Sequence, residues 1–163
     1  ITGEWLAVDG GVSVITGVDV VSIAFGANIP FVEHLGFTLE QFADGNSTLH
    51  FAPRPEHLNS FAVTHGGALM TFLDVVMATA ARSVLPESGV VTIEMKTSFM
   101  RPARAAAGGF LIGRGRLLHR TRSTAFTEGT VYDDAGEACA HATGTFRYVQ
   151  RHLGGPQAPL STD

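Results

Sequence analysis

Apolar and polar residues alternate with a period of two along most of the second half of the chain, a pattern typical of half-buried β-strands. Pro102, Arg120 and the turn at 133–136 separate four such segments. They predict strands at residues 90–100, 109–118, 123–132 and 137–149. Four long strands in close succession predict an antiparallel sheet.

Residues 68–85 lack this alternation and are apolar almost all round. Such a segment predicts a long helix that is buried on most of its sides. Pro86 and Gly89 follow and mark its end.

The segment before the long helix predicts smaller elements. Pro30 suits the first turn of a short helix that stops at Gly36. Residues 37–42 and 47–52 predict a strand pair around the turn Asp44-Gly45-Asn46.

One long apolar helix and one sheet predict an α+β domain in which the sheet wraps the helix, so that each buries the apolar face of the other. A length of 163 residues suits a single domain. We expect an N-terminal arm at residues 1–27, the folded domain at 28–150 and a C-terminal tail at 151–163.

Charged residues make up only 16% of the chain, against roughly 25% in ordinary soluble proteins. A surface this poor in charge predicts that another subunit covers part of it. The net charge of −4 argues against a protein whose whole surface binds nucleic acid. Residues 1–89 have a net charge of −7 and residues 90–163 a net charge of +3, so we expect an anionic small ligand to prefer the second half.

Several function classes lose support from missing features. Cys139 is the single cysteine and cannot form an internal disulfide, and no signal-peptide pattern is found. Asp9, Asp19 and Glu33 interrupt the apolar stretches near the start, so we expect no membrane span and a cytoplasmic protein. No metal-ligand spacing occurs among the seven histidines, and serine-hydrolase, P-loop and dinucleotide-binding motifs are absent. We therefore predict neither a metal nor a separate cofactor.

Asp74 is the only charged residue between His65 and Arg82, in the middle of the predicted buried helix. Burying an unpaired carboxylate costs several kcal/mol. Either Asp74 faces water or caps a neighbouring backbone group, or it is a general base or nucleophile in a partly apolar cleft.

His65-Gly66-Gly67 stands where the long helix starts. The first amides of a helix have no intrahelical partner and the helix dipole is positive there, so this place favours an anion such as an oxyanion. The structural alternative is a histidine that only makes hydrogen bonds beside glycines at a helix start. Nine residues separate His65 from Asp74, which is roughly 13 Å along a helix and on its opposite face. If both act on one substrate, the carboxylate must come from a second chain.

Asn59, His65-Gly66-Gly67 and Asp74, together with the strand at 92–103, resemble the hotdog-fold acyl-CoA thioesterases of the PaaI-like, phenylacetate-degradation branch of the 4-hydroxybenzoyl-CoA thioesterase superfamily. The similarity runs from about residue 29 to residue 149. It implies a hotdog fold, an antiparallel sheet wrapped around one long helix, that pairs into a homodimer and further into a dimer of dimers.

The resemblance also implies roles for individual residues. The Gly66 amide would donate to the thioester carbonyl, with His65 and Gly67 shaping the helix start. Asn59 would contact the carbonyl or the attacking water. From the partner subunit, Asp74 would act as base or nucleophile and Thr92 would orient the water or the carboxylate.

One position departs from the family pattern, because the usual glycine between the asparagine and the histidine is Ala62. A positive φ there would strain an alanine. Candidate substrate-binding residues are apolar side chains near the helix start and arginines suited to coenzyme A phosphates. They are Phe61, Met70, Arg101, Arg120 and Arg122. Solvated arginines are the structural alternative.

We therefore expect an acyl-CoA thioesterase that releases a carboxylic acid and coenzyme A. The alternative is a hotdog protein that binds acyl-CoA without hydrolysing it, which the Ala62 departure motivates. A hotdog hydratase or dehydratase lacks its His-Phe-Pro-Gly-like run and its Asp/His pairing here. The sequence leaves the acyl group open among aryl, short and medium chains.

Overall fold

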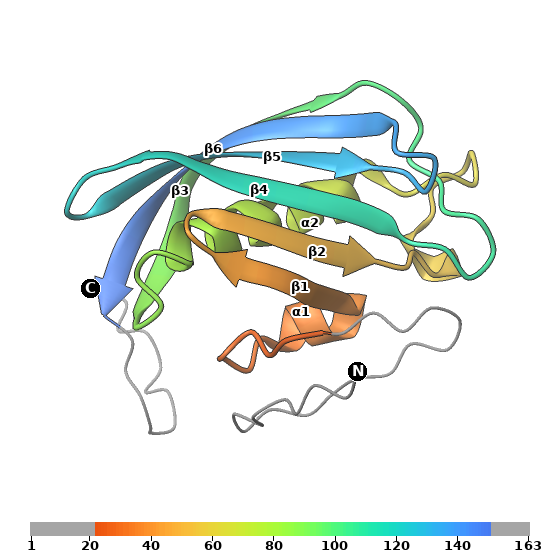
Figure 1. Cartoon of the computed structure of the whole chain (residues 1–163). Helices are drawn as coiled ribbons and strands as arrows, with labels where there is room; N and C mark the ends of the chain where they lie inside the picture. The colour runs from red at the N-terminus through yellow and green to blue at the C-terminus, as the bar shows by residue number, and fades with distance from the viewer. Residues whose placement is uncertain (1–21, 151–163) are drawn as a thin grey trace, which may run out of the picture.

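A long helix, α2 (Gly66–Arg82), lies in the hollow of a curved six-stranded sheet (Figure 1). A computed structural model describes residues 22–150. The strands are all paired antiparallel, and two short helices, α1 (Pro30–Leu35) and η1 (Pro55–His57), accompany them. The strands are β1 (Phe37–Ala43), β2 (Asn46–Phe51), β3 (Ser88–Phe99), β4 (Leu111–Arg120), β5 (Thr124–Tyr132) and β6 (Ala138–Gln150). The predicted α+β arrangement of a sheet around one helix is confirmed.

The turns form where the sequence places residues that tolerate them. Gly36 ends α1 with φ 76°, and Asp44 and Gly45 join β1 to β2 with φ 52° and 77°. Two consecutive positive φ values match the right-handed twist of the flanking strands, which explains the tight hairpin. The short helix and the strand pair are therefore confirmed.

Helix α2 begins two residues earlier and ends three residues earlier than the predicted 68–85. The early start follows from His65, whose side chain caps the helix at Gly67. At the other end, the Ser83 hydroxyl donates to the Ala80 carbonyl and accepts the Gly45 amide, both at 2.8 Å. These bonds fix the end of α2 to the β1–β2 turn.

The order of strands in the sheet, β1-β2-β4-β5-β6-β3, differs from their order along the chain. β3 leaves α2 and lies beside β6 at one end, and the chain then crosses to β4 in the middle. β1 and β3 are therefore the two edges of the sheet within residues 22–150.

Glycines on the inner face of the sheet let α2 approach closely. A Cβ atom at Gly113 would lie 2.5 Å from the Val76 side chain, and one at Gly115 would lie 2.7 Å from the Val76 carbonyl oxygen. Gly129 and Gly144 leave similar room for Met77. The buried Ser47 hydroxyl donates to that Val76 carbonyl at 2.7 Å. Phe72, Leu73, Val76 and Met77 are fully buried as a result.

Other predictions are settled by burial or fall beyond the described residues. Cys139 is fully buried in β6, where it packs in the core. No helix within residues 22–150 has the length and apolar character to cross a bilayer. The structure describes the predicted arm at 1–27 only from residue 22 onward, and the predicted tail at 151–163 lies outside the described residues.

We predict that Gly115→Ala destabilises the fold by roughly 3 kcal/mol, at the upper end of the usual range for overpacking. The new methyl group would lie 2.6 Å from the Ser47 hydroxyl and 2.7 Å from helix backbone, which is not free to move away. The free energy of unfolding in urea, at one protein concentration, measures the loss. Gly66→Ala is the control, because its methyl would meet the Phe99 ring at an ordinary 3.4 Å. Equal stability of the two variants would contradict the close seating of α2.

Candidate active site

His65 caps the start of α2 with its side chain. Its backbone is extended, with φ −60° and ψ 137°, and its Nδ1 atom accepts the Gly67 amide at 2.9 Å. In the neutral ring the proton must then sit on Nε2. The His65 amide donates to the His57 carbonyl, which ties the helix start to η1. This position fits the expected role of His65 in shaping the helix start.

The Gly66 amide lies at the first position of α2, and it has no hydrogen-bond partner among the described residues. Such an amide at the positive end of a helix dipole is a ready donor for an oxyanion. The Phe99 ring lies against Gly66, where a Cβ atom added to the glycine would meet it at 3.4 Å. The sequence did not single out Phe99, which reaches Gly66 only because β3 passes the start of α2.

Asn59 organises the loop before α2. Its Oδ1 atom accepts the amides of Phe61 at 2.9 Å and Val63 at 3.3 Å. Its carbonyl accepts the Ala62 amide, and its own amide donates to Val63. With Oδ1 occupied by the loop, Nδ2 is the group of this side chain that can donate to a substrate.

Ala62 adopts φ +54°, the left-handed conformation that the family's usual glycine accepts without strain. An alanine pays roughly 1–2 kcal/mol for this conformation. The sequence analysis left open whether this position has a positive φ, and the structure shows that it does. The hydrogen bonds that Asn59 accepts from the Phe61 and Val63 amides hold the loop in this conformation despite that cost.

Asp74 lies half-buried in the middle of α2 and accepts a hydrogen bond from the Thr92 hydroxyl at 2.7 Å. Burial raises the pKa of the Asp74 carboxyl above its usual value, and the bond from Thr92 opposes that rise. A carboxylate that is costly to keep charged and is held by one hydroxyl is suited to accept a proton or attack a carbonyl.

A β-bulge brings Thr92 to Asp74. Thr92 pairs with Phe146 and Glu94 pairs with Thr145, so Ile93 is an extra residue in β3. Such a bulge re-aims the neighbouring side chains. The sequence predicted a strand here, but it carried no signal for the bulge.

Asp74 and Thr92 line a pocket of about 290 Å³. Its walls are mostly apolar side chains from α2, β3, α1 and the segment before α1. They include Phe25, Ile29, Val32, Val75, Ala78 and Val90. A partly apolar cleft was one of the two alternatives that the sequence left open for Asp74, and the sequence did not predict that Phe25, Ala27 and Ile29 would line it.

Gly66 and Asp74 lie on the same helix, eight residues and roughly 12 Å apart along its axis. One protomer therefore does not bring them together, as the spacing predicted. In the isolated chain Thr92 is exposed, and its neighbours Val91 and Ile93 are 46% and 60% exposed.

The chain is similar in sequence to known esterases and thioesterases. Residues 61–140 match the sequence model described as "Thioesterase superfamily". A candidate esterase of Halobacterium salinarum is 31% identical over 116 residues, which cover 67% of this chain and 74% of that protein. The chain belongs to the thioesterase superfamily.

Solved structures support the same assignment. A candidate thioesterase related to phenylacetic acid degradation from Ralstonia eutropha is 29% identical, with a TM-score of 0.65, and the match covers 74% of this chain and 92% of that one. A mutant of the phenylacetic acid degradation protein PaaI from Thermus thermophilus is 27% identical, with a TM-score of 0.65, covering 74% of this chain and all of that one. The thioesterase thus has the hotdog fold of the PaaI-like type and is a thioester hydrolase.

The predicted substrate-binding arginines do not form one cluster in this thioesterase. Arg101 follows β3 and forms an ion pair with Glu137, at the end of the sheet where β6 begins. Arg120 pairs with Ala125 at the opposite end, and Arg122 lies in the turn beyond it. A single protomer therefore separates Arg101 from the other two.

The remaining predicted residues lie near the helix start. Phe61 and Met70 are 80% and 40% exposed, and the Gly67 amide is already bonded to His65. Gly67 can therefore shape this region but does not offer a free amide. No three His, Cys, Asp or Glu side chains among residues 22–150 are grouped as metal ligands.

We predict that Thr92→Val raises the pKa of Asp74 further. The hydroxyl stabilises the charged carboxylate by donating to it, so its loss favours the protonated form. Carbon NMR titration of the Asp74 carboxyl measures the shift. Thr143→Val, the same change at an exposed position of β6, should leave the titration unchanged. A pKa that stays fixed or falls in Thr92→Val would contradict the pairing.

Proposed function

We propose that this thioesterase hydrolyses an acyl-CoA to a carboxylic acid and coenzyme A at a site shared by two protomers. The observation that supports it most is the Asp74–Thr92 pair in an apolar pocket of a superfamily of thioester hydrolases. A carboxylate with a raised pKa, beside space for an apolar acyl group, suits attack on a thioester. Coenzyme A enters as part of the substrate, and no separate cofactor is proposed.

The proposed partner is a second copy of the chain, joined along β3. This strand forms an edge of twelve residues with no neighbour on its outer side among the described strands. Val91, Ile93, Phe99 and Met100 are exposed on or just after it. A long apolar edge of this kind is expected to pair with another strand. The few charges of the chain fit a covered surface, and the proposal extends to a dimer of dimers.

Antiparallel pairing of two β3 edges would assemble the site. It reverses one strand against the other, so the Gly66 end of one protomer approaches the Asp74–Thr92 pair of its partner. The same pairing brings Arg101 of one protomer toward the end of the sheet that holds Arg120 and Arg122 in the other. Three guanidinium groups near one another suit the phosphates of coenzyme A.

The proposed reaction divides the work among these groups. The Gly66 amide donates to the thioester oxygen as negative charge develops there, and the Nδ2 group of Asn59 donates nearby. Asp74 either removes a proton from water that attacks the carbonyl, or attacks it directly to form an anhydride that water then hydrolyses. In both routes the carbon–sulfur bond breaks, the thiolate of coenzyme A takes a proton, and the acid leaves. Phe61 and Met70 are proposed to contact the substrate.

We predict that Asp74→Asn lowers kcat on the best acyl-CoA by at least roughly 100-fold. The amide keeps an acceptor for Thr92 but cannot act as base or nucleophile. Its melting temperature should not fall, because a neutral group removes the cost of a buried charge. Thiol release, followed with a disulfide reporter across phenylacetyl, hydroxybenzoyl, short and medium acyl-CoA, measures activity.

Glu87→Gln provides the matched control for this variant, since Glu87 is an exposed carboxylate in the turn after α2. It should keep wild-type turnover. A folded, dimeric Asp74→Asn protein with wild-type kcat would overturn the mechanism. Wild-type protein that releases no thiol from any substrate would overturn the acyl-CoA assignment.

We predict that Gly66→Pro lowers kcat by roughly 100-fold to 1000-fold, the usual cost of one oxyanion donor. Proline is favoured at the first position of a helix, and the ψ of 137° at His65 suits a residue before proline. The substitution therefore removes the N–H group while keeping the helix. Gly66→Ala retains the donor and should stay near wild-type activity. Equal turnover of the two variants would exclude the Gly66 amide as a donor.

A further inference from the structure

The segment Ser22–Ile29 forms part of the wall of the pocket that contains Asp74, through Phe25, Ala27 and Ile29. Its first contact is with the edge of the sheet, where the Ile23 amide donates to the Leu39 carbonyl at 2.7 Å. It then turns at Gly26, with φ 67°, and leads into α1. We call residues 22–29 the strap.

Arg82, in the last turn of α2, holds the strap on the helix. Its Nη1 atom donates to the Phe25 carbonyl at 3.2 Å, and its guanidinium group lies over the Phe42 ring, 5.5 Å from the centroid. Arg82 lies eight residues after Asp74 on the same helix. It therefore fixes the backbone of Phe25 at a distance from Asp74 along the pocket.

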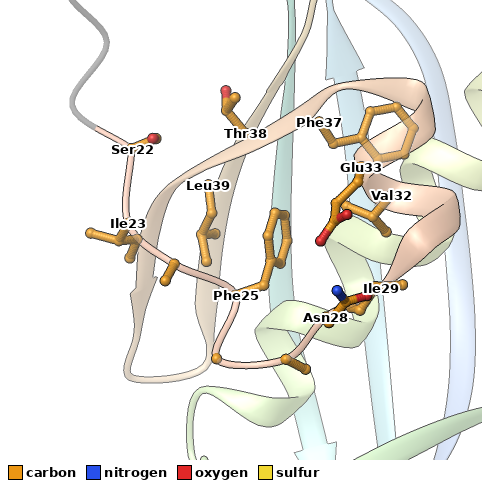
Figure 2. Close-up of a pocket in the computed structure, with 13 residues that line it drawn as sticks. Ser22, Ile23, Phe25, Asn28, Ile29, Val32, Glu33, Phe37, Thr38 and Leu39 are labelled. Atoms are coloured by element: carbon orange, nitrogen blue, oxygen red, sulfur yellow. The ribbon is translucent and has the colours of Figure 1, made fainter. Parts of the chain in front are cut away.

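The strap separates two cavities. On one side is the pocket of about 290 Å³ with Asp74 and Thr92. On the other is a cavity of about 390 Å³ between the strap, α1 and β1, which extends to Glu33 and Thr38. Figure 2 shows the Phe25 ring directed from the strap toward the space between Leu39 and Val32. Phe25, Ala27, Ile29 and Val32 line both cavities.

We propose that the strap sets the size of the acyl group that this thioesterase accepts, with Phe25 as the wall that ends the acyl pocket. This inference rests on the proposed function, because it takes the pocket beside Asp74 to be the acyl site. A cavity of about 290 Å³ is about twice the roughly 150 Å³ that is enough for a benzene ring. The favoured class is therefore an apolar acyl group of about phenylacetyl or hexanoyl size.

The chemistry of the walls narrows this class further. Val75, Ala78 and Val90 line the acyl pocket, and although Thr79 and Arg82 also line it, most of its side chains are apolar. Beyond Phe25, the described lining of the second cavity holds the Glu33 carboxylate and no lysine, arginine or histidine. A chain that passes Phe25 would therefore need an end without a negative charge.

The test is the ratio of kcat/KM for dodecanoyl-CoA to that for hexanoyl-CoA in wild type and in Phe25→Ala. Removing the ring joins the two cavities, so the ratio should rise at least about 10-fold, since each newly buried methylene is worth about a factor of four. Phe126→Ala is the matched control, because Phe126 is exposed on the outer face of β5 and lines neither cavity. Its ratio should equal that of wild type.

Phe25→Leu gives a second variant if Phe25→Ala does not fold. Leucine keeps apolar packing on the core but shortens the wall, so the ratio should rise by a smaller factor. An unchanged ratio in a folded Phe25 variant, or an equal loss of kcat/KM across the series, would overturn the proposal.

Binding measurements distinguish a failure of the strap proposal from a failure of the proposed reaction. The dissociation constants of non-hydrolysable hexanoyl and dodecanoyl thioether analogues of acyl-CoA are measured by calorimetry in the same variants. If the wild type hydrolyses nothing while the dissociation-constant ratio shifts in Phe25→Ala, the reaction is wrong and the strap proposal stands. If hydrolysis depends on Asp74 but neither ratio moves, the reaction stands and the strap proposal fails. If neither analogue binds and nothing is hydrolysed, both fail.

Discussion

The close seating of α2 on a glycine-lined sheet is the constraint on which the rest of the structure depends. The Val76 carbonyl accepts the buried Ser47 hydroxyl, and the positions of Gly113 and Gly115 leave no room for a side chain beside it. This contact fixes the rotation of the helix about its axis. Rotation decides which residues enter the core, so it also decides which face carries Asp74. A side chain in the glycine groove would move the helix and every group on it.

The same helix supplies three positions of the proposed site at fixed distances along its axis. Gly66 presents an amide with no partner among the described residues at the start of α2, Asp74 presents a carboxylate in its middle, and Arg82 holds the strap at its end. Because the rise per residue of a helix is constant, these positions cannot change relative to one another. The partly buried carboxylate lowers stability while making Asp74 a better proton acceptor, which is the usual trade between stability and activity.

The proposed dimer of this member of the thioesterase superfamily gives three features of the single protomer a common explanation. Within residues 22–150 of one protomer the Gly66 amide has no hydrogen-bond partner, β3 has an unpaired apolar edge, and Arg101 lies at the opposite end of the sheet from Arg120. A twofold partner along β3 completes all three in the proposed enzyme. The strap is different, because it is built from the same chain as Asp74 and can define the acyl pocket within one protomer.

The sequence by itself determined the elements and the spacing of the site along them. Alternation, the apolar run and the turn residues at Gly36 and Asp44-Gly45 act locally, so the helices and strands follow from them to within a few residues. The separation of His65 from Asp74 follows from helical rise alone. Only the tertiary structure decided that β3 lies beside β6, that a bulge at Ile93 turns Thr92 toward Asp74, and that the strap lines the pocket. These features depend on pairing and packing between segments far apart in the chain, and a local pattern does not specify which distant partner a strand or loop will meet.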